Sequence, residues 1–425
     1  MAGDGGNERV TARVRWTIRG LLRWWLIVPL LLVIAYSLAV SLTGDMLETE
    51  LRAMKARGDP VTLKDAVPTI PPGARNAADL YQQAFDVLPL DCDPSALLKS
   101  GAAARSAVAH AAPGLELLHE ATEIQDCAFS VDWKADPWSW DQTPRAAMRN
   151  AARWLYVEAR VLTADGRPDD ALRACGAIFR LGTHAQSHPT EIPEMVGIAI
   201  YELGLGALRD CLQTGEPSPE ACRDLFNELG RVDLEAAHDR AIRGESAWAL
   251  DAFTRLRHGD PGTVWALGGS AQAGAWLDVA WLQVYRTAGR PFLNLDELAF
   301  VEYAQGKRSS TNGWPMCNAI PSGHVDTHAT SYMAAIAVAR AALALRACQA
   351  KQGRYPGSLA ELSAVGWKLP KDPFGGADLR YRREKRGFAV WSVGPNMAND
   401  QAVEYDSASM SLADGPYDIV FRVKR

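Results

Sequence analysis

Residues Trp24 to Leu42 read WWLIVPLLLVIAYSLAVSL, a run of nineteen residues that contains no charged side chain. As a helix this run is ~28 Å long, close to the ~30 Å hydrocarbon core of a bilayer. A buried helix of a soluble core rarely needs so long an uncharged run beside a group of arginines. We therefore predict a single transmembrane helix over residues 24–42, with the lipid bilayer as a partner.

The charges on the two sides of this run differ. The first turns after it are acidic, whereas the residues before it carry an excess of arginine, namely Arg9, Arg13, Arg15, Arg19 and Arg23. Because positive segments stay in the cytoplasm, we predict a cytoplasmic segment 1–23, a bacterial inner-membrane location and a periplasmic body. The alternative is a signal sequence cleaved near the small residues Ser37, Ala39 and Ser41.

The composition indicates a globular chain. Its 425 residues are 48% hydrophobic and carry a net charge of -5, which allows more than one core. The mildly acidic balance offers no positive surface, so no nucleic-acid partner is expected. The seven cysteines show neither CxxC nor zinc-ligand spacing. In an oxidising compartment we expect a disulfide between Cys211 and Cys222, which flank the loop of a predicted helical hairpin, and as a second choice one between Cys92 and Cys127. Buried free thiols are the alternative.

The periodicity divides the rest of the chain. Proline and glycine in residues 58–74 interrupt the helical pattern, so we predict a linker over residues 43–75. Residues 76–324 are predicted to form an α-helical domain of helical hairpins. The hairpin over residues 144–184 resembles one tetratricopeptide unit through its short turn and its small residues Ala159 and Ala171.

A change of pattern near residue 325 predicts a domain boundary. A long helix over residues 327–352 is followed by short runs with strand character at residues 379–382, 388–393 and 419–423. Residues 325–425 are therefore predicted to be a small α+β domain. The fold class of the whole chain is mainly α.

The C-terminal part carries three motifs in order. They are Gly353, Tyr355 and Pro356, then Leu369, Pro370, Asp372 and Pro373, and finally Tyr381, Ser392, Val393 and Gly394. This order resembles the globular head of the major pseudopilins of type II secretion. The pseudopilin processing site and the glutamate of the pseudopilin membrane helix are absent from the anchor, so we do not expect a processed fibre subunit.

The resemblance also implies a calcium site. In pseudopilins the loop after an S-L-G sequence holds Ca²⁺ through acidic residues, and oxygen ligands suit this hard cation. The corresponding loop, SVGPNMANDQA, offers Asn396, where an acid is usual, and Asp400, while Asp418 lies in the closing segment. These three residues are the predicted metal ligands. The alternative is a turn whose side chains bind its own backbone.

Other candidate sites have simpler explanations. His184 with His188 and His324 with His328 have the i, i+4 spacing of metal-binding pairs, and Glu191 or Glu194 would add a carboxylate to the first. Both pairs sit at expected helix ends, where histidine also suits the helix dipole.

A polar ladder of Glu235, Asp239 and Arg243, with His238 and Glu245 nearby, would suit a cleft. It suits a solvated helix face equally well.

These observations predict a non-enzymatic scaffold or docking component of an envelope or secretion-related complex, with protein partners in the cell envelope. No catalytic residue is assigned. The alternative is an envelope hydrolase that acts on cell-wall glycans. It rests on the polar ladder and on Trp133, Trp138 and Trp140, whose rings would stack on sugars.

Overall fold

The computed structural model describes residues 5–130, 143–259, 284, 287–305, 326–405 and 417–424. These residues are mainly helical, and a small antiparallel sheet lies near the C-terminus, which confirms the predicted fold class at this level. The chain forms two compact units. Unit 1 comprises Met1–Thr62 and Ser246–Pro321, and unit 2 comprises Leu63–Glu245 and Ser322–Arg425.

Unit 1 is built on α1, a helix of 52 residues from Gly5 to Ala56. The apolar run lies within it, and most of the large apolar side chains there that the structure describes are exposed. The helix continues through residues 43–56, which were expected to belong to the linker. Leu47, Leu51 and Met54 explain the continuation, because their helical spacing gives α1 an apolar face that packs into a core.

Two further helices bury that face of α1. These are α13, Arg290–Ala304, and the part of α10, Leu234–His258, that belongs to unit 1. Phe253 and Leu293 are fully buried in this core. An ion pair between Arg257 and Glu297 joins α10 to α13.

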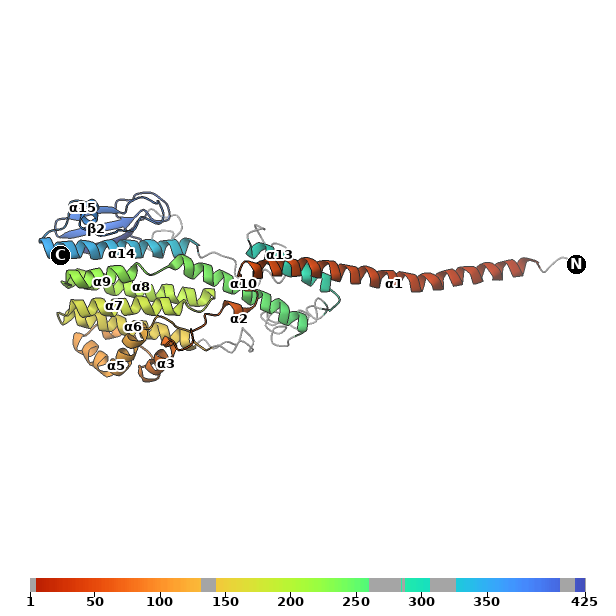
Figure 1. Ribbon diagram of the computed structural model, residues 1–425, viewed down its shortest axis with the longest axis horizontal. Coiled ribbons are helices and arrows are strands. Elements are labelled where there is room, and N and C mark those ends of the chain that lie inside the picture. The colour runs from red at the N-terminus through yellow and green to blue at the C-terminus, as the bar shows by residue number, and fades with distance from the viewer. Residues whose placement is uncertain are drawn as a thin grey trace. The chain divides into compact units, whose positions relative to one another are not determined.

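Unit 2 stacks helices in chain order. Figure 1 shows α6, α7, α8 and α9 side by side, with α3 and α5 beyond α6. The bounds are α2 Leu63–Ala66, α3 Ala77–Val87, α4 Pro94–Leu97, α5 Gly101–Thr122, α6 Thr143–Ala164, α7 Pro168–Ala185, α8 Glu191–Thr214 and α9 Pro219–Leu229.

Glycines allow α7 and α8 to approach closely. A Cβ atom on Gly182 of α7 would lie 2.6 Å from the ring of Tyr201. A Cβ atom on Gly197 of α8 would lie 2.7 Å from the Gly182 carbonyl oxygen. Larger side chains at these positions would force the helices apart.

The long helix α14, Asp326–Gln352, is buried on most of its surface. It packs on α8 and α9 with one side and on the sheet with the other (Figure 1). The sheet and the helical hairpins consequently share one hydrophobic core. The units thus differ from the predicted ranges 76–324 and 325–425, because a helix that is apolar all round must be covered on both sides.

The sheet has the order β1-β2-β3 and is antiparallel. Its strands, Arg380–Glu384, Gly387–Ser392 and Ile419–Lys424, match the three predicted strands within two residues at each end. Every residue of the central strand β2 is buried. The short helix α15, Leu359–Ala364, lies between α14 and β1 in the sequence.

The cysteine prediction is wrong for both expected pairs. The structure has buried free thiols at Cys92, Cys127, Cys175, Cys211, Cys222 and Cys348, and Cys317 lies outside the described residues. The Cys211 thiol donates a hydrogen bond to the Pro168 carbonyl oxygen at 3.6 Å instead of reaching a partner sulfur. Burial raises the pKa of Cys222 to about 12, which keeps this thiol protonated.

Candidate functional site

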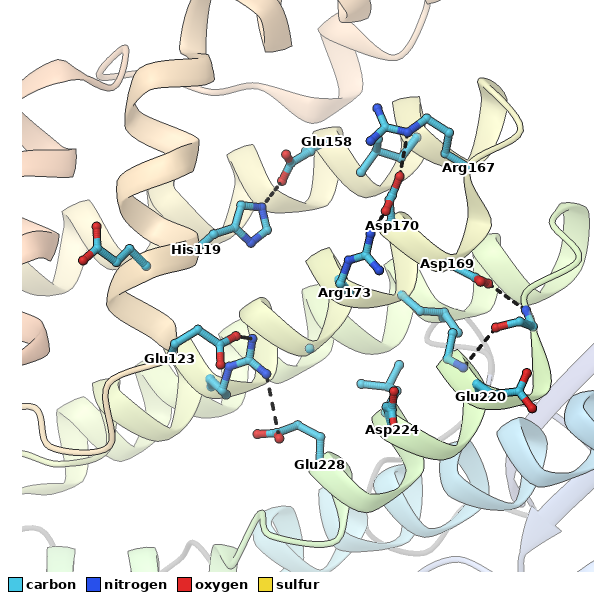
Figure 2. A pocket seen from close by; sticks show the side chains of 18 residues that line it. His119, Glu123, Glu158, Arg167, Asp169, Asp170, Arg173, Glu220, Asp224 and Glu228 are labelled. Carbon is cyan, nitrogen blue, oxygen red and sulfur yellow. Dashed lines mark hydrogen bonds and ion pairs between the residues drawn. The ribbon is translucent and has the colours of Figure 1, made fainter.

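A groove of about 800 Å³ crosses one face of unit 2 (Figure 2). Its walls come from α5, α6, α7 and α9. Most of its lining is charged, and the charged residues are His119, Glu120, Glu123, Glu158, Arg167, Asp169, Asp170, Arg173, Arg180, Glu220, Asp224 and Glu228. Apolar side chains such as Leu172 and Leu225 line the rest.

The turn between α6 and α7 shapes one end of the groove. Gly166 has a φ of 73°, a left-handed conformation that suits glycine, and Pro168 opens α7. Asp169 accepts a hydrogen bond from the Ser218 backbone N–H at 2.7 Å. The Ser218 hydroxyl in turn caps α9 by accepting from the Ala221 N–H at 3.1 Å. The starts of α7 and α9 are therefore fixed to each other.

Side-chain contacts between histidine or arginine and carboxylates link the groove walls. His119 of α5 contacts Glu158 of α6 at 2.8 Å. Arg180 of α7 reaches Glu123, the residue that follows α5, at 2.6 Å and Glu228 of α9 at 3.8 Å. One arginine thus connects three walls.

The α9 wall is a row of carboxylates. Glu220, Asp224 and Glu228 follow at i, i+4 and i+8, which places them on one face of the helix, and Figure 2 shows them along the groove. Glu228 pairs with Arg180 and Arg231. Glu220 and Asp224 are exposed and have no partner among the described residues. Like charges at this spacing repel each other and destabilise the helix slightly.

The lining as a whole is negative. It contains eight carboxylates and three guanidinium groups. Arg167 and Arg173 both pair with Asp170, and Arg180 is engaged as described. The groove therefore offers free carboxylates and already-paired arginines, an arrangement that favours a positively charged ligand.

No motif in the sequence marks these residues as a site. The one sequence feature that points to the groove is the tetratricopeptide-like hairpin of α6 and α7, which supplies Glu158, Asp169 and Asp170. The acidic row on α9 is visible in the sequence as three acids at i, i+4 spacing. Only the packing of α9 beside α7 turns that row towards the other carboxylates.

The two histidines of the first pair, His184 and His188, contact different partners in the structure. The His184 Nδ1 atom lies 2.7 Å from the Tyr81 hydroxyl, and the His188 Nδ1 atom lies 3.2 Å from the Thr190 hydroxyl. Burial lowers the pKa of both histidines to about 4. No group of three or more His, Cys, Asp or Glu side chains suited to a metal occurs in the part of the chain that the structure describes. His324 and the side chain of His328 lie outside that part.

The structure brings the carboxylates beside the first histidine pair into contact with residues near the polar ladder, although the two groups are far apart in the sequence. Glu194, only 2% exposed, contacts the His238 Nδ1 atom at 3.2 Å. The Glu245 carboxylate accepts a hydrogen bond from the Glu191 N–H at 3.0 Å. Burial raises the pKa of Glu194 and Glu245. These contacts hold α10 against the start of α8.

The structure brings Asn396 and Asp400 of one loop together with Asp418, which lies just before β3. The Asn396 amide donates to Asp400 at 2.9 Å, while the Asn396 carbonyl oxygen accepts from the Ala398 N–H at 3.0 Å. Asp418 accepts from the N–H groups of Asp400 and Ala402 at 3.2 and 2.7 Å. Backbone N–H groups thus bind the oxygens of Asn396 and Asp418, in the manner of the alternative prediction, and the Asn396 amide binds the Asp400 carboxylate. Calcium binding would have to replace or share these bonds, and it stays a prediction.

The tryptophan loop of the hydrolase alternative, Trp133, Trp138 and Trp140, lies outside the described residues. The polar ladder starts at Glu235 in the first turn of α10. Glu235, Asp239 and Arg243 do not line the groove.

Comparison with known proteins gives no family: no protein-family description, characterised protein or solved structure matches this chain.

Proposed function

We propose that this protein is a single-pass membrane protein whose periplasmic helical unit docks a partner protein of the cell envelope in the groove of unit 2. The anchor would be residues 24–42, with the N-terminus in the cytoplasm. The observation that carries the proposal is the excess of carboxylates in a groove assembled from four helices. Such grooves between stacked helices are the binding surfaces of helical-repeat proteins.

The chemistry of the groove defines the docked segment. Glu220 and Asp224 are free to bind lysine or arginine. Arg180 is already paired with Glu123 and Glu228, so it does not need an anionic group from the ligand. A segment with two or more positive side chains would relieve the repulsion along α9. Exposed ion pairs contribute little binding free energy. Electrostatic attraction would therefore affect the association rate and the orientation of the docked segment more than its affinity. We propose a lysine- or arginine-bearing segment as the ligand.

A secretion-related complex is the proposed setting, because the C-terminal motifs resemble the pseudopilin head. In this proposal the head and the groove belong to one rigid unit through α14. The resemblance gives the setting only, and the groove gives the binding chemistry.

The test is a double substitution of the free carboxylates, E220Q/D224N, in the full-length protein. We expect capture of basic envelope partners by brief crosslinking to fall about threefold to tenfold, since two exposed pairs are lost. The matched control is E116Q/D91N, which removes two exposed carboxylates outside the groove and should leave capture unchanged. Equal capture by both variants would show that the groove is not the docking site.

A further inference from the structure

Helix α13 approaches α1 at the level of the predicted membrane span. The Tyr36 hydroxyl of α1 donates a hydrogen bond to the Thr287 carbonyl oxygen, just before α13, at 2.7 Å. Asn294 of α13 donates to the Thr43 hydroxyl at 3.1 Å and to the Val40 carbonyl oxygen at 3.5 Å. The contacts advance along both helices together, so α13 runs parallel to α1.

The parallel direction sets the depth of each residue. Tyr36 lies six residues before Leu42, the last residue of the apolar run, which is ~9 Å along a helix. The Thr287 carbonyl group at the level of Tyr36 therefore lies within the outer part of the span. The other end of α13 packs beside Leu47 and Met54, well beyond the span.

Two apolar side chains at or before the start of α13 are exposed. Phe292 in the first turn is 57% exposed and Val284, which precedes the helix, is 52% exposed, although the neighbouring Leu293 is fully buried. Arg290, the half-buried first residue of α13, interacts electrostatically with Arg257, Tyr36 and Glu297. Aromatic side chains and arginine are enriched where a protein meets the membrane interface, because one part of each prefers acyl chains and the other prefers headgroups.

We propose that the N-terminal end of α13 with Arg290 and Phe292, together with Val284 before the helix, lies in the periplasmic interface of the membrane and binds lipid directly. This inference rests on the proposed membrane anchorage of α1, and it adds a second lipid contact that is more than 240 residues away in the sequence. Phe292 and Val284 contact the upper acyl chains, and Arg290 contacts lipid phosphate. Unit 1 is thereby fixed against the membrane surface and does not swing on a single helix.

The experiment places the photoreactive residue p-benzoylphenylalanine at position 292 of the full-length protein in phosphatidylcholine/phosphatidylglycerol vesicles that contain radiolabelled phospholipid. Position 32 is the reference inside the span, where Leu32 is 65% exposed. Position 365 is the reference in unit 2, where Val365 is 54% exposed. A second labelled position, 284, guards against a folding defect caused by the change at 292.

We expect lipid adducts at positions 292 and 284 in a yield close to that at position 32 and several times that at position 365. Adducts at position 32, but no more at 292 and 284 than at 365, would overturn the lipid contact of α13 and leave the anchor intact. No adduct even at position 32 would show that α1 does not span the bilayer, which overturns the anchorage in the proposed function together with this inference.

Discussion

At the scale of single residues, Gly244 shows how one position can fix a helix. A Cβ atom there would lie only 1.5 Å from the Pro189 carbonyl oxygen in the turn between α7 and α8. No rearrangement of a flexible side chain relieves such a clash, because the obstacle is backbone. The Glu194–His238 contact and this close approach together fix the part of α10 that belongs to unit 2 against α8 and the turn before it.

The substitution Gly244→Ala is therefore expected to lower the free energy of unfolding by about 2 kcal/mol or more, since overpacking forces backbone shifts. The measurement is urea denaturation followed by circular dichroism. Gly206→Ala in α8 is the matched control. Its Cβ would meet only the Tyr156 ring at an ordinary 3.6 Å, so it should raise stability by up to about 1 kcal/mol. Equal effects of the two substitutions would contradict this packing.

Two histidines, His184 and the half-buried His188, should make the free energy of unfolding depend on pH. The folded-state pKa of His184 and of His188 is lowered to about 4 by burial, below the ordinary value near 6.5. Between pH ~4 and pH ~6.5 these histidines bind protons in the unfolded chain but not in the folded chain. The free energy of unfolding contributed by each histidine is thus fully present above pH ~6.5 and is lost as the pH falls towards ~4, by up to about 3 kcal/mol.

Glu194 and Glu245 act in the opposite direction, because burial raises the pKa of both carboxyls. The informative measurement is therefore a difference between variants at pH 7 and pH 5. His188→Gln should lose less stability on acidification than the unsubstituted protein, and the exposed His110→Gln should behave like the unsubstituted protein. An unchanged loss in His188→Gln would mean that His188 takes up its proton in the folded state.

At the scale of elements, α14 holds the C-terminal sheet and the hairpins together. Its Arg346 is only 2% exposed and donates to the Gly215 carbonyl oxygen after α8 at 2.8 Å. The same guanidinium donates to the Tyr355 hydroxyl at 2.9 Å, in the G-x-Y-P motif. A single buried side chain thus links two parts of the sequence that the pattern assigned to different domains.

Arg346→Met should lower the stability of unit 2 by about 1–3 kcal/mol, because it removes the buried guanidinium hydrogen bonds to the Gly215 carbonyl oxygen and the Tyr355 hydroxyl. Urea denaturation with separate probes, one near the sheet and one in the hairpins, should still give one transition. Arg354→Met removes an exposed arginine from a surface pair and should change stability by less than about 1 kcal/mol. Two separate transitions in the unsubstituted protein would contradict a shared core.

At the scale of the whole molecule, α1 combines two roles in one helix. Its apolar run is exposed in unit 1, whereas the residues after the run pack into a core. This single continuous helix connects the apolar run directly to the core of unit 1, with no linker between them. The Pro- and Gly-rich segment begins only after Ala56.

We expect L31R/L32R to remove the protein from carbonate-washed membranes, because each arginine at the centre of a span costs about 2.5–3.5 kcal/mol on insertion. The control L31V/L32V keeps an apolar run and should stay in the membrane. An amino-terminal tag that remains on the membrane-bound protein would rule out cleavage near Ser41. Retention of L31R/L32R in the washed membranes would contradict the anchor.

The sequence by itself determined the long apolar helix, the helical hairpins and the three C-terminal strands. These features follow from local periodicity and turn residues, which act within a few positions of the chain. The spacing of Leu47, Leu51 and Met54 also indicates that the helix extends to Ala56. The nearby proline-rich residues instead suggested a linker there.

Only the tertiary structure decided which faces meet. It set the α9 carboxylates against those of α7, paired Glu194 with His238, and left the Cys211 and Cys222 thiols unbonded. It also joined α14 to the hairpins in one core. Each of these outcomes depends on how residues distant in the sequence pack, and a local pattern shows that a helix has an apolar or acidic face without showing which neighbour covers it.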